Sequence, residues 1–347
     1  MNKAAGLALL IGVIAGITSY YLGMPLPWML GPMIGVTIAA LAHAPVQSPN
    51  RLRPIVIPII GVMLGSAISP DITGQLGSWA LTFALLPVFL ICAAGVSFAV
   101  YAKIGRYDAV TAFYAAMPGG LNEMLIMGEE AGGDGRRIAL AHAARVLLVI
   151  LCVALYFGFV LGVRAGPGNT TWTALNALTL WDYIGLGLCA VLGVPLGKLL
   201  RLPAAQVFGP MILSGAIHIL EWVTVAPPTL MIIIAQIAIG TIIGGRFVGA
   251  TLAEVGKDLL LALGATLGMI GVAVVFAELI VIAVGMPLSQ AFLAFSPGGL
   301  TEMSLLTLAM GQDVAFVSVT HIVRITVVIA VAPLLFRLFQ KHVLAGR

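Results

Sequence analysis

The residues that could do chemistry gather in two short stretches that interrupt apolar sequence. The first reads Ala-Met-Pro-Gly-Gly-Leu-Asn-Glu-Met over residues 116–124, and the second reads Phe-Ser-Pro-Gly-Gly-Leu-Thr-Glu-Met over residues 295–303. Proline removes a backbone donor and paired glycines permit unusual backbone angles, so each stretch predicts a break in a helix. In lipid, a break needs protein or a wet cavity to satisfy its backbone, and a carboxylate there is usually functional.

Each break is followed by a segment that carries three polar residues on one predicted helical face. These residues are Asp134, His142 and Arg145 after the first break, and Asp313, His321 and Arg324 after the second. Their spacings of eight and three residues fit 3.6 residues per turn. We expect the aspartates to cap the helices. The histidines are either hydrogen-bonded packing residues or groups that titrate near neutral pH.

Two interpretations of the acidic and basic residues remain open. In one, Glu123 pairs with Arg145 and Glu302 pairs with Arg324, and the ion pairs only fix the geometry. In the other, the same groups line a site for a substrate anion and a coupling ion, H⁺ or Na⁺. The candidate substrate- and ion-binding residues are Pro118, Gly119, Gly120, Asn122, Glu123, His142, Arg145, Pro297, Gly298, Gly299, Thr301, Glu302, His321 and Arg324.

The composition places these residues in a membrane protein. The chain is 61% hydrophobic and 9% charged over 347 residues, whereas soluble domains carry roughly 25% charged residues. The fold class expected is therefore an all-α polytopic membrane protein. The net charge of +4 comes from basic residues scattered singly over loops, which does not indicate a nucleic-acid partner.

Hydrophobic runs of spanning length and the two breaks occur in the same order in both halves of the chain. The Pro-Gly-Gly stretches, Gly61 and Gly240, and Arg145 and Arg324 all share an offset of 179 residues. The sequence predicts a first repeat over residues 1–163, a linker over 164–180 and a second repeat over 181–347. Each repeat has about five transmembrane helices and one re-entrant or discontinuous helix.

Loop charges predict how the two repeats are oriented. If each broken segment enters and leaves on one face, nearly all basic loop residues, from Lys3 to Arg347, lie on the same side, and Arg164 is the exception. The positive-inside rule makes that side cytoplasmic and places both termini there. Five crossings per repeat then make the two repeats inverted. Inverted repeats with broken helices are typical of secondary transporters.

The sequence resembles the AbrB family of bacterial inner-membrane proteins. The resemblance rests on the Leu-Gly-Pro-Met stretch at 30–33, the two Pro-Gly-Gly-Leu-x-Glu-Met stretches and the two His-x-x-Arg pairs, and it covers about residues 5–340. It implies a multi-pass protein of the inner membrane. The family is labelled as regulators of AidB expression or as ammonia monooxygenases, and it is similar to cation–proton antiporter and anion transporter folds.

We therefore expect an ion-coupled secondary transporter for a small organic anion, with an indirect effect on gene regulation. The alternatives are a membrane regulator of gene expression that does not transport and, more remotely, a membrane monooxygenase. No signature of a hydrolase, zinc protease or phosphate-binding loop is present, so an enzyme is not expected. We expect no catalytic residue, metal or cofactor beyond the coupling ion. The expected partners are the lipid bilayer and the substrate, and a homodimer is left open.

Overall fold

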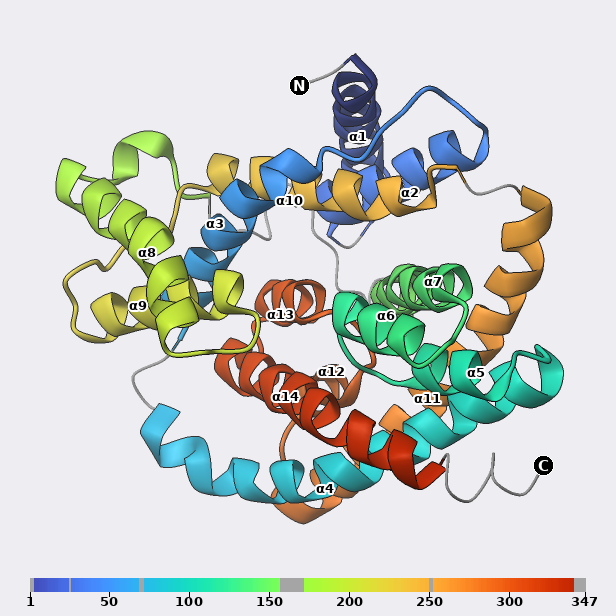
Figure 1. The fold of residues 1–347 in the computed structure, drawn as a ribbon. Coiled ribbons are helices and arrows are strands. Elements are labelled where there is room, and N and C mark those ends of the chain that lie inside the picture. Colours follow the sequence, from blue (N-terminus) through green and yellow to red (C-terminus); the bar gives the residue numbers. More distant parts are fainter. Residues whose placement is uncertain (1–2, 25, 69–71, 157–171, 250–251, 340–347) are drawn as a thin grey trace. The chain divides into compact units, whose positions relative to one another are not determined.

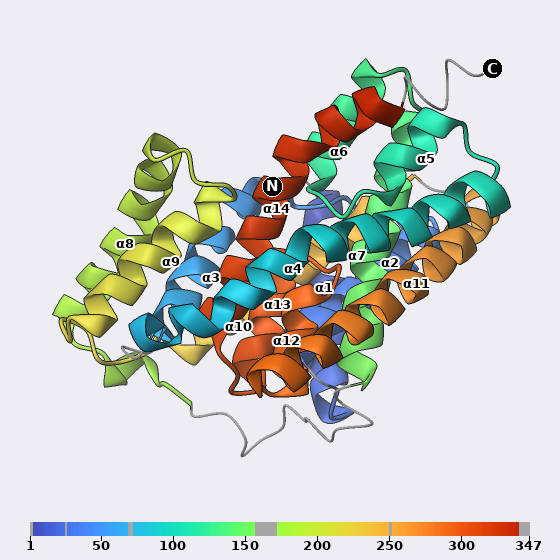
Figure 2. The same cartoon turned by 90° about the horizontal axis from the view of Figure 1, so that it is seen from below.

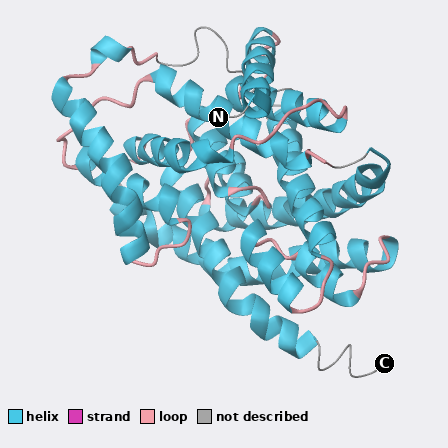
Figure 3. Ribbon diagram, turned by 45° about the horizontal axis from the view of Figure 1, so that its top comes forward, coloured by secondary structure: helices cyan, strands magenta, loops and turns pink. Residues whose placement is uncertain are grey.

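The computed structural model describes residues 3–24, 26–68, 72–156, 172–249 and 252–339, and this part of the chain is helical without strands (Figure 3). The predicted apolar runs coincide with helices, and each predicted break separates two short ones. The α-helices are α1 Lys3–Tyr21, α2 Pro27–Leu41, α3 Arg53–Ser66, α4 Ile72–Ala99, α5 Ala109–Ala116, α6 Leu121–Glu130, α7 Gly135–Leu155, α8 Leu180–Leu199, α9 Ala205–Ile219, α10 Thr229–Gly244, α11 Leu252–Val284, α12 Leu288–Phe295, α13 Leu300–Ala309 and α14 Val314–Phe339.

Among the described residues, six helices are long and apolar enough to cross a membrane. They lie within Lys3–Tyr21, Trp79–Ile104, Leu180–Leu199, Thr229–Phe247, Gly256–Val284 and Val314–Leu338. Large apolar side chains such as Ile14, Ile91 and Ile282 point outward on these helices. Apolar surface of this extent fits a lipid environment. The architecture is thus that of an all-helical chain suited to a membrane.

Two compact units divide the chain, and each takes helices from both predicted repeats. Unit 1 holds α1 to α3, α8 to α10 and most of α13. Unit 2 holds most of α4 to α7, α11, α12 and most of α14. Residues 164–171 of the predicted linker lie outside the described part of the chain. The repeat boundaries stay a prediction.

In unit 1 the helices of the two repeats pack reciprocally. Within each repeat, α1 packs on α2 and α8 packs on α9. Between the repeats, α3 packs on α9 and α10 packs on α2 (Figure 1). The third helix of each repeat therefore packs against the second helix of the other repeat.

Glycines make this close approach of helices in unit 1 feasible. A Cβ at Gly61 on α3 would collide with the carbonyl oxygen of Val207 on α9, and one at Gly240 on α10 would collide with that of Met29 on α2. Small residues at such spacing let helix backbones approach each other. Gly61 and Gly240 therefore mark tight contacts between helices.

In unit 2, α4 and α11 run side by side (Figure 2). The ring centroid of Phe89 on α4 lies 5.6 Å from that of Phe276 on α11 and 5.1 Å from that of Phe295 on α12. The ring of Phe336 on α14 packs against Phe113 on α5, with centroids 5.3 Å apart. Helices of both repeats therefore also share the core of unit 2, and this core holds the first break.

Candidate functional site

The first break lies at the apex of a helical hairpin. Helix α5 ends at Ala116, α6 begins at Leu121, and the backbone between them is extended at Met117 and Gly120. Helix α6 turns back along α5. This is seen at Gly128 on α6, where a Cβ would lie against Tyr114 on α5. The backbone amide of Asp134, after α6, also donates to Oγ1 of Thr111 on α5 over 2.8 Å. The sequence allows either a re-entrant hairpin or a discontinuous helix at each break. The first break forms a hairpin.

Arg145 on α7 satisfies the backbone of this apex. Its side chain is buried, with 6% of its surface exposed. Nη1 donates to the carbonyl oxygen of Met117 over 2.8 Å, and Nη2 donates to that of Gly119 over 3.2 Å. The end of α5 and the proline leave these carbonyls without helical partners. The planar guanidinium can donate to both at once, so Arg145 holds the two sides of the break together.

His142 binds the end of α5 one turn before Arg145. Its Nε2 lies 2.9 Å from the carbonyl oxygen of Tyr114, and its Nδ1 lies 3.1 Å from Nη2 of Arg145. A guanidinium only donates, so Nδ1 is the acceptor and the ring proton sits on Nε2. His142 is therefore a neutral imidazole in this arrangement, and a second proton would break its contact with Arg145. This is the geometry of a hydrogen-bonded packing residue.

The second break repeats these hydrogen bonds. Arg324 is 3% exposed and donates to the carbonyl oxygens of Ser296 and Gly298 over 2.5 and 2.6 Å. His321 Nε2 lies 2.9 Å from the carbonyl oxygen of Leu293. The sequence separations of 28, 26 and 28 residues are the same as in the first copy. One difference is that Nδ1 of His321 has no hydrogen-bond partner within the described residues.

One of the two interpretations left open pairs Glu123 with Arg145, but the structure shows no ion pair between these two described residues. Glu123 is the third residue of α6, and its carboxylate lies over the α-carbon of Gly120, the residue before the helix. A negative charge there complements the helix dipole. The terminal nitrogens of Arg145 are instead occupied by backbone carbonyls and His142.

Glu302 lies at the matching position of α13, but its side chain is buried, with 9% exposed. The cations whose charges reach its carboxylate are Arg246 and Arg53, which belong to unit 1 as Glu302 does. One of the two interpretations left open by the sequence pairs Glu302 with Arg324 instead. Thr301 beside it is half-buried, and the side chain of Asn122, its counterpart, lies outside the described residues.

The proline and glycine residues of the breaks are closely packed. Pro118, Pro297 and Gly298 are buried, whereas Gly119, Gly120 and Gly299 are half-buried. A Cβ at Gly119 would press on Val328 of α14, within unit 2. The first glycine pair thus has little room for side chains.

The two aspartates cap the helices that carry the arginines, as predicted. Oδ1 of Asp134 accepts from the backbone amide of Arg137 over 3.1 Å, and Oδ1 of Asp313 accepts from that of Phe316 over 3.0 Å. These bonds satisfy donors that a helix start leaves unpaired.

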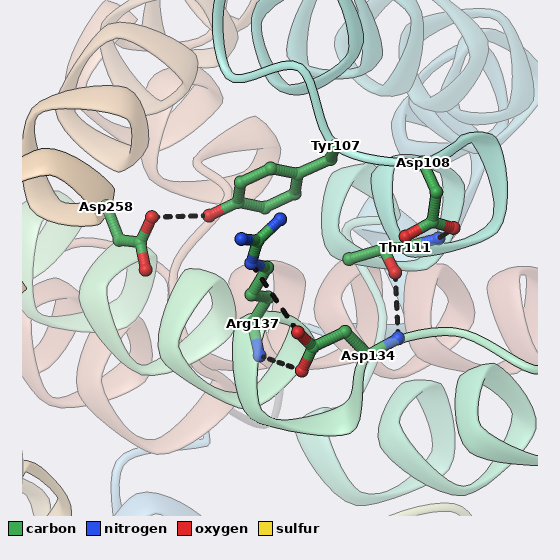
Figure 4. A network of polar contacts seen from close by, with 6 residues as sticks. All are labelled: Tyr107, Asp108, Thr111, Asp134, Arg137 and Asp258. Carbon is green, nitrogen blue, oxygen red and sulfur yellow. Dashed lines mark hydrogen bonds and ion pairs between the residues drawn. The ribbon is translucent and has the colours of Figure 1, made fainter. Parts of the chain in front are cut away.

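A polar network closes the base of the first hairpin (Figure 4). The Tyr107 hydroxyl donates to Oδ1 of Asp258 on α11 over 2.8 Å. The guanidinium of Arg137 lies 4.9 Å above the Tyr107 ring and forms an ion pair with Asp134. Burial, followed by the hydrogen bond to Asp258, raises the pKa of the Tyr107 phenol above its ordinary value, so Tyr107 remains a donor at neutral pH.

Histidine, cysteine and carboxylate residues do not converge in the described part of the chain. It contains no group of three or more of these side chains placed to hold a metal ion. Cys92, Cys152 and Cys189 are free thiols.

A comparison with protein families matches residues 28–340 of the chain to a family model described as "Transition state regulatory protein AbrB". The matched range contains both breaks and both arginines. The chain belongs to the AbrB family. The resemblance seen in the sequence motifs is therefore confirmed.

Two relatives match the AbrB-family chain over nearly its whole length. "Uncharacterized protein YhjN" of Bacillus subtilis (strain 168) is 24% identical over 345 residues, covering 92% of this chain and 88% of the relative. "Putative regulator AbrB" of Escherichia coli (strain K12) is 24% identical over 343 residues, covering 97% of each chain. The chain is similar to these proteins from end to end.

Several features of this AbrB-family site could not be found in the sequence. The arginine partners are backbone carbonyls, which carry no residue-type signal. Arg246 and Arg53 are far along the chain from Glu302, so their proximity carries no local sequence signal. Tyr107 and Asp258 are 151 residues apart, and neither has a counterpart in the other copy that would have marked it.

Proposed function

We propose that this AbrB-family protein is a secondary transporter of the bacterial inner membrane that couples the movement of a small organic anion to H⁺ or Na⁺. The observation that carries the proposal is the pair of buried arginines in unit 2. Arg145 and Arg324 are both buried, and the charge of Arg145 reaches Arg324. Both donate to backbone carbonyls, and neither forms an ion pair with a carboxylate among the described residues of its own unit.

Two like charges without carboxylate partners favour a negatively charged ligand. Burying a charge is costly unless an opposite charge or hydrogen bonds compensate it. The carbonyls compensate the guanidinium groups in part, and the Nε atoms of both arginines have no partner among the described residues. An organic anion near these groups would lower the electrostatic cost of their burial.

The repeated breaks supply the mobile elements that transport requires. Transporters with inverted repeats place their sites at broken helices and move one bundle against another. The matching hydrogen bonds of Arg145 and Arg324 support two duplicated breaks that function as a pair. The inverted orientation and the cytoplasmic termini follow from the loop charges and form part of this proposal.

The glutamates are the proposed coupling groups. Glu123 and Glu302 each begin a helix after a break, where a proton or Na⁺ would change the charge next to the substrate. Asn122 and Thr301 would add oxygen ligands for Na⁺. Glu123 is exposed, whereas Glu302 is buried. The coupling ion would therefore bind a solvated carboxylate in the first copy and a buried one in the second.

Transport by the purified protein in liposomes tests the proposal. We would load proteoliposomes with a pH-sensitive dye, add acetate, succinate or citrate in turn, and repeat each assay with a Na⁺ gradient. We expect ion-dependent uptake of at least one anion class, with loss of uptake in Arg145→Gln and in Arg324→Gln. Lys103→Gln removes an exposed cation and serves as the matched control. Uptake that is equal in all four proteins would overturn the assignment.

A second candidate function is a membrane regulator that does not transport. The names of the family model and of the Escherichia coli relative favour it. The discriminating experiment compares gene expression in a deletion strain that carries either the wild-type gene or the Glu123→Gln/Glu302→Gln variant. A transporter that acts indirectly would lose transport and regulation together. Normal regulation by a variant that is inactive in transport would favour the regulator.

A further inference from the structure

An apolar cavity lies beside the first break in unit 2. Its volume is about 100 Å³, and its walls come from α4, the break and α14. Its walls include Ile91, Met117, Pro118, Val328, Val331 and Ala332. All of them belong to unit 2, and every residue around the cavity has an apolar side chain. A cavity of this kind does not offer water the polar partners that it needs.

The cavity runs from an exposed mouth to a buried floor. Ile91 at the mouth is 62% exposed, whereas Val328 and Ala332 are nearly fully buried. Ile91 lies near the middle of the Trp79–Ile104 span, and Val331 lies within the Val314–Leu338 span. The mouth therefore opens on the apolar surface of two helices that are suited to cross a membrane. The medium at that depth of a bilayer is hydrocarbon, not water.

We infer that this cavity binds one acyl chain of a bilayer lipid. An empty cavity forfeits dispersion contacts along its walls, and an alkyl chain restores them without any polar penalty. A charged or hydrogen-bonding ligand would find no partner there. The inference requires the membrane setting but does not rest on the transport function.

The occupant would act on the break itself. Met117 and Pro118 line the cavity, while the carbonyl oxygen of Met117 accepts from Arg145. The acyl chain would thus support the side chains of the segment whose backbone the guanidinium holds. A bound lipid is therefore expected to stabilise the closed apex of the hairpin.

Photo-crosslinking in liposomes tests this site. The full-length protein is reconstituted in phosphatidylcholine that carries a diazirine in one acyl chain, illuminated, and digested for peptide mass spectrometry. We expect adducts on Met117 or Val328, at the buried end of the cavity. Adducts confined to outward-facing residues that do not line the cavity, such as Val88 and Leu334, would overturn the inference.

A matched pair of variants makes the test specific. Ala332→Phe fills the cavity and is expected to reduce the Met117 adduct severalfold. Leu334→Phe places the same ring on the exposed face of α14 and is expected to leave it unchanged. If Ala332→Phe does not fold, Ala94→Leu replaces it as a smaller filler of the same cavity. An adduct yield that does not change in a folded filling variant would contradict an acyl-chain site.

Water is the remaining alternative, and a thiol probe distinguishes it. We expect Met117→Cys in liposomes to resist a water-soluble methanethiosulfonate reagent. Rapid modification would show that water fills the cavity and would overturn the proposal. These assays involve no transport, so their failure and the failure of the proposed transport function are separate results.

Discussion

Nη1 of Arg145 donates to the carbonyl oxygen of Met117 over 2.8 Å, across 28 residues of sequence. The same bond joins Arg324 to Ser296 in the second copy, across the same number of residues. A side chain on one helix thus completes the backbone of a broken one, twice in the same chain. These arginine side chains donate hydrogen bonds to backbone carbonyls. This role determines the effect that we expect from their substitution.

Replacing the guanidinium should destabilise the hairpin even when the charge remains. Arg145→Lys keeps the charge, but a single ammonium group cannot reproduce the planar fork that serves Met117 and Gly119. A hydrogen bond from a charged donor contributes about 1.5–3 kcal/mol, so loss of one should lower the midpoint of thermal unfolding in detergent clearly. Arg324→Lys should act alike. A midpoint equal to that of the wild type would contradict the backbone-holding role.

Neutralising the glutamates should separate coupling from folding. Glu123→Gln and Glu302→Gln keep the side-chain shape but remove the carboxylate that we propose as the coupling group. We expect coupled uptake to be lost in each variant, while the amount of folded protein stays at the wild-type level. Proteoliposome uptake and size-exclusion chromatography measure the two properties. Wild-type uptake in both variants would remove the glutamates from the mechanism.

Tyr107→Phe should weaken the base of the first hairpin in a pH-dependent way. The variant loses the hydrogen bond to Asp258, at a cost of about 1 kcal/mol. The raised pKa of Tyr107 means that the folded state holds the phenolic proton more tightly than the unfolded state. Its stabilisation is therefore complete below the ordinary tyrosine pKa of 10.0 and declines as pH rises beyond it.

The corresponding measurement is chemical unfolding of both proteins at several pH values. The stability advantage of the wild type over Tyr107→Phe should be constant near neutral pH and should shrink in alkaline solution. An advantage that grows with pH would contradict the sign of the shift.

Glycine substitutions should test the packing of unit 1. Gly61→Ala places a methyl group against the carbonyl of Val207, and overpacking of this kind costs about 1–3 kcal/mol. Gly187→Ala on α8 is the matched control, because nothing lies within 4 Å of its added Cβ. We expect a lower unfolding midpoint for the first variant and an unchanged or higher one for the second. Equal midpoints would show that α3 and α9 can separate without cost.

Sequence periodicity and composition predicted most helices because long apolar runs are unambiguous. The breaks could be predicted because proline and glycine affect the backbone at their own positions. The caps at Asp134 and Asp313 could be predicted because a capping side chain bonds to amides only a few residues away. One of the two interpretations left open paired Arg145 with Glu123, but backbone carbonyls are its partners in the structure. A nearby carboxylate such as Glu123 was the simplest partner by residue type, but a helix end supplies unpaired carbonyls that are closer and need no ion pair.

The division into compact units also lay beyond the sequence. The duplication predicted two repeats in order along the chain, but which helices pair depends on which surfaces match. Gly61 faces α9 and Gly240 faces α2, and only the three-dimensional arrangement shows this exchange.

The exchanged third helices of unit 1 have a consequence for biosynthesis. While the ribosome is still making residues beyond 200, α2 and α3 are complete but lack α10 and α9, their later partners. The first half of the nascent chain must wait in an unfinished state until the second half emerges. Two separately expressed halves should accordingly be degraded alone and rescue each other when they are produced in the same cell.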